Sequence, residues 1–363
     1  MWVNLLADGY TGGLPDGATY DGIVPFTRPD DLSTPNPAYF RRVDPMVGLA
    51  AKHDLVVFFD PIETGGWLKV LRSNGVAKAY AYGRYLGRRY RRYANIVWLN
   101  GNDYETWSQP ADDAVVLAVA RGIRSVDPDQ LQTIELNFLS STSLDDTRWR
   151  GIIGLDAAYT YFPTYAEVLK AQGNHDHIPA FLIEATYEGE GRYTGPETLR
   201  RQEYWTMLSG ATGQFYGNHY TWQFLPGWSR HLNTIGSRQM TFVTNLFSHR
   251  QWFELVPDTM HRLVISGYGT YSVDGDVNRN GYATAARTPD GKLAIAYVPA
   301  GQPIIVDLRR MAGPVRAQWY DPTSEKYTTI AGSPLARRAT HLFTPPDKNH
   351  DGNDDWVLVL TAA

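Results

Sequence analysis

The stretch DLVVFFDP, residues 54–61, is a continuous apolar run that ends in an acidic residue and a proline. A strand covered by helices on both faces has this composition, because neither face meets water. Residues 95–100 (NIVWLN) and 179–185 (PAFLIEA) repeat the pattern. Helical stretches separate these runs, and the alternation predicts an α/β fold with a parallel sheet.

Extending the pattern in both directions gives seven candidate strands. They are residues 2–6, 54–60, 95–100, 131–138, 155–161, 179–185 and 213–218. The helices predicted around them are residues 74–93, 112–126, 165–172, 196–209 and 228–248. Eight strands, each followed by a helix, form a (β/α)8 barrel of about 250 residues. Because the chain begins inside a strand, we predict a TIM barrel over residues 1–252 that lacks its first βα unit.

The pattern changes near residue 253, where helical periodicity stops. Short alternating runs separated by turn signals follow, at residues 262–265, 282–288, 293–298, 304–308, 315–320 and 356–360. Many short strands of this kind are typical of a β-sandwich. We therefore predict a small all-β sandwich domain over residues 253–363.

Composition excludes several classes of protein. The chain has 363 residues, no cysteine and a formal net charge of −4. Without cysteine there are no disulfides, zinc–thiolate sites or thiol nucleophiles. The charge argues against nucleic acid as the main partner, and no apolar run is long enough to span a membrane. GxGxxG, GK[ST] and HExxH motifs in the contexts that nucleotide and zinc-hydrolase sites require are absent from the sequence. Aromatic residues make up 13% of the chain, which suits binding of sugars as well as core packing.

Active sites of parallel barrels lie at the carboxyl ends of the strands. The polar and aromatic side chains at those ends are Asn4, Asp60, Asn102, Asp103, Asn137, Tyr161, Glu184, His219 and Trp222. Asp103 and Glu184 stand out because a carboxylate at the end of an apolar strand is costly unless it is paired or used. Two carboxyl groups on either side of a sugar are what glycoside hydrolysis requires. A helix cap for Asp103 and an ion pair for Glu184 are the structural alternatives.

Three motifs resemble one family. They are residues 100–103 (NGND) after an apolar strand, residues 183–189 (IEATYEG), and residues 209–218 (SGATGQFYGN) with Trp222 shortly after. Together they resemble the apiosidase-like glycoside hydrolases. Residues 319–322 (WYDP) and 355–360 (DWVLVL) are similar to the domain that usually follows in that family, which is named for collagen binding. The resemblance covers nearly the whole chain.

The resemblance implies roles for individual residues. Asp103 would be the general acid/base and Glu184 the nucleophile of a retaining glycosidase, with Glu188 as a competing nucleophile. Asn102 would lie near a sugar hydroxyl, Trp222 would form a platform under the ring, and Tyr187 would be a further substrate contact. The chain departs from the family in one respect, since relatives begin with a further strand and helix that carry residues near the sugar.

The stretch DKNHDGNDD, residues 347–355, places oxygen-bearing side chains at alternating positions, as calcium loops do. Its candidate ligands are Asp347, Asn349, Asp351 and Asp355. It lacks the glutamate at the twelfth position of an EF-hand loop, where Leu358 stands, so an acidic hairpin turn is the alternative. Residues 276–281 are a shorter version of the same pattern.

The sequence therefore predicts a retaining glycosidase that cleaves O-glycosidic bonds of plant or microbial polysaccharide side chains. It needs no cofactor. Whether the acidic stretch 347–355 binds a structural calcium ion is left open by the sequence. Its partner would be an oligosaccharide or polysaccharide, and the oligomeric state stays undetermined. The substrate class favours a secreted or periplasmic protein, although no signal peptide is visible. The alternatives are a non-catalytic carbohydrate- or matrix-binding protein and an inactive, N-terminally truncated fragment.

Overall fold

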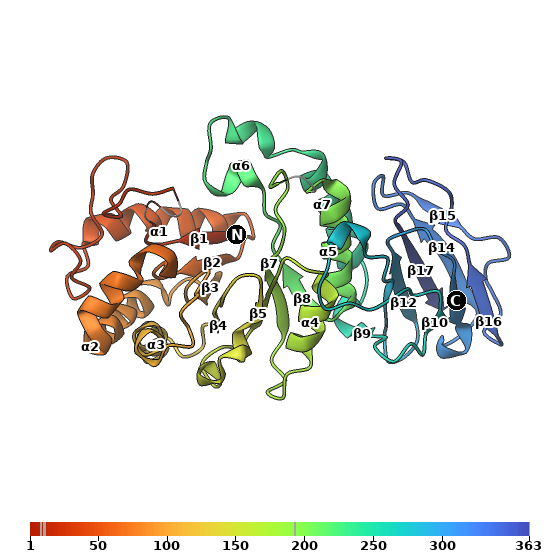
Figure 1. The fold of residues 1–363 in the computed structure, drawn as a ribbon, viewed down its shortest axis with the longest axis horizontal. Coiled ribbons are helices and arrows are strands. Elements are labelled where there is room, and N and C mark those ends of the chain that lie inside the picture. The colour runs from red at the N-terminus through yellow and green to blue at the C-terminus, as the bar shows by residue number, and fades with distance from the viewer. Residues whose placement is uncertain (8, 10–11, 192–193, 363) are drawn as a thin grey trace. The chain divides into compact units, whose positions relative to one another are not determined.

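The computed structural model describes residues 1–7, 9, 12–191 and 194–362. The chain divides into two compact units. Unit 1 comprises Met1–Tyr159 and Asn174–Pro179, and unit 2 comprises Thr160–Gly173 and Ala180–Ala363. Figure 1 shows strands and helices alternating along the first two thirds of the chain and antiparallel strands in the last third.

Unit 1 contains a parallel sheet of four strands in the order β1-β2-β3-β4. The strands are β1 (Trp2–Asn4), β2 (Val57–Asp60), β3 (Ile96–Leu99) and β4 (Gln132–Thr133). Asn4 is in register with Asp60, and Leu99 with Thr133, so the carboxyl ends of the strands share one edge. β2 and β3 are buried over their whole length, in agreement with their apolar sequences.

Three helices connect the strands of this sheet: α1 (Pro37–Lys52), α2 (Thr64–Tyr90) and α3 (Pro110–Arg124). α1 and α3 each begin with a proline in the first turn, where its missing N–H costs no helical hydrogen bond. Asn36 caps α1, because its side chain accepts a hydrogen bond from Ala38 N at 3.0 Å. Beyond β4 the unit continues through β5 (Ser140–Thr142), η1 (Ser143–Asp145), η2 (Thr147–Trp149) and β6 (Asp156–Thr160).

The first half of unit 2 keeps the strand–helix alternation. β7 (Ala180–Glu184) and β8 (Ala211–Gln214) pair in parallel. The helical elements are α4 (Thr164–Gln172), α5 (Pro196–Leu208), α6 (His219–Trp222), η3 (Trp228–His231), α7 (Ile235–Ser248) and η4 (Trp252–Glu254). Glu184, the last residue of β7, is 9% exposed.

The second half of unit 2 contains two antiparallel sheets. The larger has the order β15-β14-β17-β12-β11-β9, and the smaller has the order β10-β13-β16. The strands are β9 (Val256–Pro257), β10 (Val264–Ser266), β11 (Thr284–Arg287), β12 (Leu293–Val298), β13 (Ile304–Asp307), β14 (Val315–Tyr320), β15 (Tyr327–Thr329), β16 (Thr340–Phe343) and β17 (Trp356–Ala362), with η5 (Val277–Arg279) and η6 (Leu308–Arg310) between them.

The six-stranded sheet is buried on both faces. Leu358 and Leu360 of β17 belong to a core shared with the smaller sheet. Val357 and Val359 belong to a second core, which also contains side chains of α5 and α7 such as Trp205. Successive residues of a strand point to opposite faces, so a strand between two cores must be apolar throughout. This explains the unbroken apolar sequence of residues 356–360.

Two consecutive arginines of α5 tie it to loops of the C-terminal sheets. Arg200 is fully buried and makes two hydrogen bonds to Asp355, at 2.8 and 2.7 Å. The burial is tolerable because the two charges compensate each other with good geometry. Arg201 donates to the carbonyl oxygens of Asn280 and Pro299, at 2.8 and 3.1 Å. α5 therefore links the two halves of unit 2.

The α/β fold and the C-terminal antiparallel sheets agree with the sequence analysis, whereas some element boundaries do not. The helix expected over 228–248 is two elements, η3 and α7, because Thr234 caps a new helix through its side chain. The strand expected over 131–138 is only the two-residue β4. α1 was not predicted. The TIM barrel that lacks its first βα unit, and the boundary at residue 252, stay predictions.

Candidate active site

In unit 1 the last residue of β2, Asp60, has a buried carboxyl group. Asp60 Oδ1 accepts hydrogen bonds from Ile62 N at 3.1 Å and Gly101 N at 3.4 Å. Its other oxygen, Oδ2, is buried and has no hydrogen-bond partner among the described residues. Burial raises the pKa of Asp60 to about 7, and the two N–H donors only partly offset this. Asp60 is thus a carboxyl group that changes its charge near neutral pH.

Asn4 and Asn102 lie at the carboxyl ends of the two strands that flank β2. Asn4 is the register partner of Asp60, and its Oδ1 accepts a hydrogen bond from Trp2 Nε1 at 2.8 Å. The main chain of Asn102 is fixed by Thr64, whose hydroxyl donates to Asn102 O at 2.5 Å and accepts from Asn102 N at 3.0 Å. Within the described part of the chain, the buried Asn102 Oδ1 has no hydrogen-bond partner.

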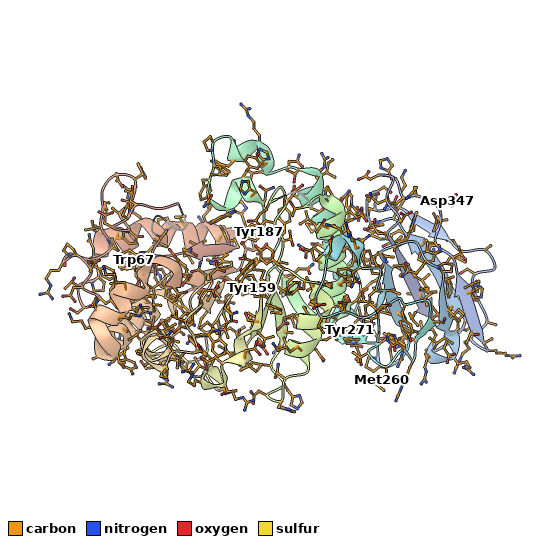
Figure 2. The ribbon with its side chains drawn as sticks, in the orientation of Figure 1. Trp67, Tyr159, Tyr187, Met260, Tyr271 and Asp347 are labelled. Carbon is orange, nitrogen blue, oxygen red and sulfur yellow. The ribbon has the colours of Figure 1, made fainter. Side chains whose placement is uncertain are left out.

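Asp103 has an unusual backbone conformation, with φ of 42°. Residues other than glycine seldom adopt this left-handed region, although aspartate tolerates it better than most. The main-chain N–H of Asp103 donates to Glu135 Oε2 at 3.1 Å, and the hydroxyl of Tyr159 donates to Asp103 Oδ1 at 2.8 Å. These two contacts fix both the backbone and the carboxylate of Asp103. Tyr159 is labelled in Figure 2.

Glu135 and Tyr159 were missed by the sequence analysis. Glu135 is 1% exposed and lies between the buried Ile134 and Leu136. The argument that singled out Glu184, a carboxylate within an apolar run, applies equally to Glu135 and would have found it. Asn137, which was predicted, accepts a hydrogen bond from Trp107 Nε1 at 2.7 Å.

In unit 2 the carboxylate of Glu184 is held by two tyrosines. The Tyr161 hydroxyl donates to Glu184 Oε1 at 3.1 Å, and the Tyr187 hydroxyl donates to Oε2 at 2.7 Å. The ring of Tyr187, labelled in Figure 2, meets that of Trp222 edge-on with centroids 6.3 Å apart. Trp222 is 39% exposed. The structure therefore brings together four residues that the sequence analysis selected: Tyr161, Glu184, Tyr187 and Trp222.

Glu188, the competing nucleophile, is occupied by structural contacts. Its Oε2 accepts hydrogen bonds from Tyr216, from Thr234 Oγ1 at 2.5 Å and from Asn218 Nδ2 at 3.3 Å. Its Oε1 accepts from Gly236 N, at the start of α7, at 3.1 Å. Burial and the nearby Glu188 raise the pKa of Tyr216 to about 12, so Tyr216 remains a donor.

His219 follows this cluster in the chain. Its main-chain N–H donates to Glu188 O at 2.9 Å. Its ring Nδ1 is buried and lacks a hydrogen-bond partner within the described residues.

The proposed calcium ligands have other partners. Asp355 binds Arg200, Asp351 Oδ2 accepts from Gln239 Nε2 at 2.7 Å, and Asn349 Oδ1 accepts main-chain N–H groups of the same loop. Asp347, labelled in Figure 2, accepts from Trp356 Nε1 through its carbonyl oxygen. Over the residues that the structure describes, no group of three or more His, Asp or Glu side chains could hold a metal. The stretch 347–355 is a loop that joins β16 of the smaller sheet to β17 of the larger one and receives Arg200, and calcium binding there stays a prediction.

Comparison with known proteins shows a fold similar to that of glycoside hydrolases. Two solved structures are similar over nearly the whole chain: a protein titled "Glycoside hydrolase" and a glycoside hydrolase of family 5 from Bacteroides vulgatus. Each has a TM-score of 0.82 and 22% sequence identity; they match 100% and 99% of this chain, and 85% and 82% of their own chains. At this identity they show the fold. No curated protein matches the sequence.

Two family models match separate parts of the chain. Residues 271–361 match the family described as "Putative collagen-binding domain of a collagenase". Residues 14–254 match the family described as "Apiosidase-like, catalytic domain". Because the match to the catalytic domain covers well over half of the chain, the protein belongs to the apiosidase-like family.

Proposed function

We propose that the protein is a retaining glycosidase that cleaves O-glycosidic bonds in side chains of plant or microbial polysaccharides. Membership of the apiosidase-like family supports glycoside hydrolysis. The observation that carries the proposal is the carboxylate of Glu184, both oxygens of which accept a tyrosine hydroxyl beside the exposed ring of Trp222.

Glu184 is the proposed nucleophile. A nucleophilic carboxylate must be ionised and oriented toward the anomeric carbon. Two O–H donors favour the charged form and restrict rotation of the carboxylate. Its neighbour Trp222 offers an exposed aromatic surface on which the apolar face of a sugar ring can stack.

Asp103 is the proposed general acid/base. In the first step Asp103 gives its proton to the glycosidic oxygen while Glu184 attacks the anomeric carbon, which forms a glycosyl ester and releases the alcohol. In the second step Asp103 takes a proton from water, and the resulting hydroxide displaces Glu184. Glu135 and Tyr159 support this role because they fix the backbone and the side chain of Asp103.

The remaining strand-end residues are proposed substrate contacts. Asn102 Oδ1 and His219 Nδ1, both buried without partners among the described residues, are available to sugar hydroxyl groups. We include Asn4, Asp60 and Asn137 as further polar contacts. Tyr161 and Tyr187 are included because their hydroxyls donate hydrogen bonds to Glu184. No cofactor is needed in this mechanism.

The test is release of reducing sugar from arabinan, from pectin and from nitrophenyl glycosides of pentoses and deoxyhexoses. We expect at least one of these substrates to be hydrolysed, and Glu184→Gln and Asp103→Asn to lose at least about 1,000-fold in kcat, about 4 kcal/mol in barrier. Asp129→Asn, at an exposed carboxylate, is the matched control. Full activity of Glu184→Gln would refute the assignment of the nucleophile.

Retention is tested separately, by following the anomeric configuration of the first product by proton NMR. A retaining enzyme releases the sugar with the configuration of the substrate. Initial release of the opposite anomer would show inversion and would remove the covalent step. Binding of these polysaccharides without any turnover would favour a non-catalytic binding protein.

A polysaccharide substrate favours action outside the cytoplasm, so we propose a secreted or periplasmic location. In the part of the chain that the structure describes, no helix has the length and apolar character needed to cross a bilayer. Fractionation of the producing cells, with detection of the protein by antibody, tests the location.

A further inference from the structure

The segment between β8 and α7 exposes aromatic side chains. We call residues 219–233 the aromatic loop; it contains α6 and η3 and projects from the top of unit 2 in Figure 1. Phe224 is 68% exposed and Trp222 is 39% exposed. The ring of Phe224 packs edge-on against that of Trp228, with centroids 5.1 Å apart. The exposed ring of Phe224 and the half-buried ring of Trp228 form an apolar patch, and such patches are common at ligand-binding sites.

Phe224 also has a strained backbone, with φ of 52°. A bulky residue rarely adopts this conformation, and it costs about 1–3 kcal/mol when it does. Burial of the ring does not compensate, because the ring is mostly exposed. Strain of this sort is found where a side chain has to be presented to a ligand.

The aromatic loop is closed at its base by one carboxylate. Glu188 accepts hydrogen bonds from Asn218 Nδ2 before the loop and from Thr234 Oγ1 and Gly236 N after it. Inside the loop the rings of Tyr220 and His231 stack with centroids 3.7 Å apart. Both contacts restrict the loop, so its aromatic rings are held in place before any ligand arrives.

The loop is continuous with the proposed nucleophile. Trp222, near its start, contacts Tyr187, and Tyr187 holds Glu184. A sugar placed at Glu184 and Trp222 would therefore leave the rest of its glycan chain near Phe224 and Trp228. The loop contains no acidic residue and carries Arg230, so it repels neither a neutral glycan nor a uronate-bearing one.

We propose that the aromatic loop is a binding site for the glycan chain beyond the cleaved sugar, with Phe224 and Trp228 stacking on a second sugar ring. The proposal rests on the proposed function, because it takes Glu184 as the point of cleavage. It makes the substrate class more specific: the preferred substrate is a chain of sugars and not a single glycoside with a small leaving group.

The test measures binding without turnover. Glu184→Gln is the parent protein, and its retardation in native gels that contain arabinan or pectin gives the affinity for the chain. We expect Phe224→Ala and Trp228→Ala in this parent to weaken binding about tenfold each, which corresponds to about 1.4 kcal/mol of lost apolar contact. Phe253→Ala, at a phenylalanine that is 70% exposed outside the loop, is the matched control and should leave retardation unchanged.

Kinetics of the active enzyme give a second readout. Phe224→Ala should raise KM for the polysaccharide about tenfold and change kcat/KM for a nitrophenyl glycoside by less than about threefold. Equal losses on both substrates, or no loss of binding in the gel, would overturn the proposal. If the wild-type protein hydrolyses none of the substrates while retardation of the Glu184→Gln protein still depends on Phe224, the proposed function is refuted and the glycan site is retained.

Size-exclusion chromatography tests the remaining explanation, which is that the exposed rings form an interface between two copies of the chain. In that case Phe224→Ala would change a dimer into a monomer. That result would overturn the glycan site. We expect the elution volume of the variant to equal that of the parent.

Discussion

The hydroxyl of Tyr187 donates to Glu184 Oε2 at 2.7 Å from a position only three residues further along the chain. The same ring contacts Trp222. Tyr187 thus orients the proposed nucleophile and also supports the proposed sugar platform. A change at Tyr187 should therefore affect chemistry even when its ring is kept.

We expect Tyr187→Phe to lower kcat/KM about 10- to 100-fold, because a hydrogen bond to a charged group contributes about 1.5–3 kcal/mol. Steady-state kinetics on the best substrate measure the loss. Tyr161→Phe removes the longer bond, at 3.1 Å, and should cost less. An unchanged rate in both variants would contradict the role of the tyrosines.

Gly217 controls the position of Tyr187. A Cβ atom at Gly217 would overlap the Tyr187 ring. We expect Gly217→Ala to displace that ring and to lower kcat/KM at least as much as Tyr187→Phe. Gly195→Ala is the control, since a Cβ there meets nothing within 4 Å. Comparable activity of the two alanine variants would show that the ring can move without consequence.

Glu135 should act through Asp103. Its carboxylate accepts the N–H of Asp103, whose φ is 42°. Glu135→Gln keeps an acceptor oxygen and should lower kcat about tenfold, whereas Glu135→Ala should lower it further; KM should change little in either. A rise in KM at constant kcat would indicate that Glu135 binds substrate instead.

Arg200 and Asp355 should be important for stability. Removal of one member leaves a buried charge without compensation, so Arg200→Met should cost about 3–5 kcal/mol of unfolding free energy. Urea unfolding followed by tryptophan fluorescence measures it. Arg279→Met breaks the solvent-exposed pair with Asp276 and should barely change the midpoint. A small effect of Arg200→Met would mean that Asp355 is reached by water.

Glu203 of α5 should make stability depend on pH. It is 1% exposed, and burial raises its pKa well above the usual range. The folded state therefore keeps a proton that the unfolded chain releases above about pH 4.3, and Glu203 reduces stability progressively as pH rises from there. Glu203→Gln should be more stable than the parent at about pH 8 and equal to it at about pH 4. Urea unfolding at both values, with Glu254→Gln as an exposed control, checks the sign.

The sequence alone was sufficient to predict those structural features that a single segment determines. The apolar run 54–61 predicted a buried strand, and its final acid is the buried Asp60. The strand ending at Glu184 was predicted for the same reason. α1 was missed because it contains Pro45, and a proline inside a helical pattern normally marks its end.

Contacts between distant residues could not be predicted from local pattern. Tyr159 reaches Asp103 across 56 positions of the chain, and Glu188 reaches Thr234 across 46. Only the fold brings such residues together. For this reason the sequence left Glu188 as an alternative nucleophile, whereas the structure gives it four hydrogen-bond donors from the base of the aromatic loop.

The six-stranded sheet, buried on both faces, has a consequence for protein engineering. A detachable module presents a polar exterior, but residues 357 and 359 would expose valine side chains if the C-terminal sheets were expressed alone. A fusion protein built from residues 271–361, the span of the family match, should aggregate. Transplanting this domain to another enzyme requires α5 and α7 to accompany it, so recombination between relatives is expected to exchange these helices and the sheets as one block.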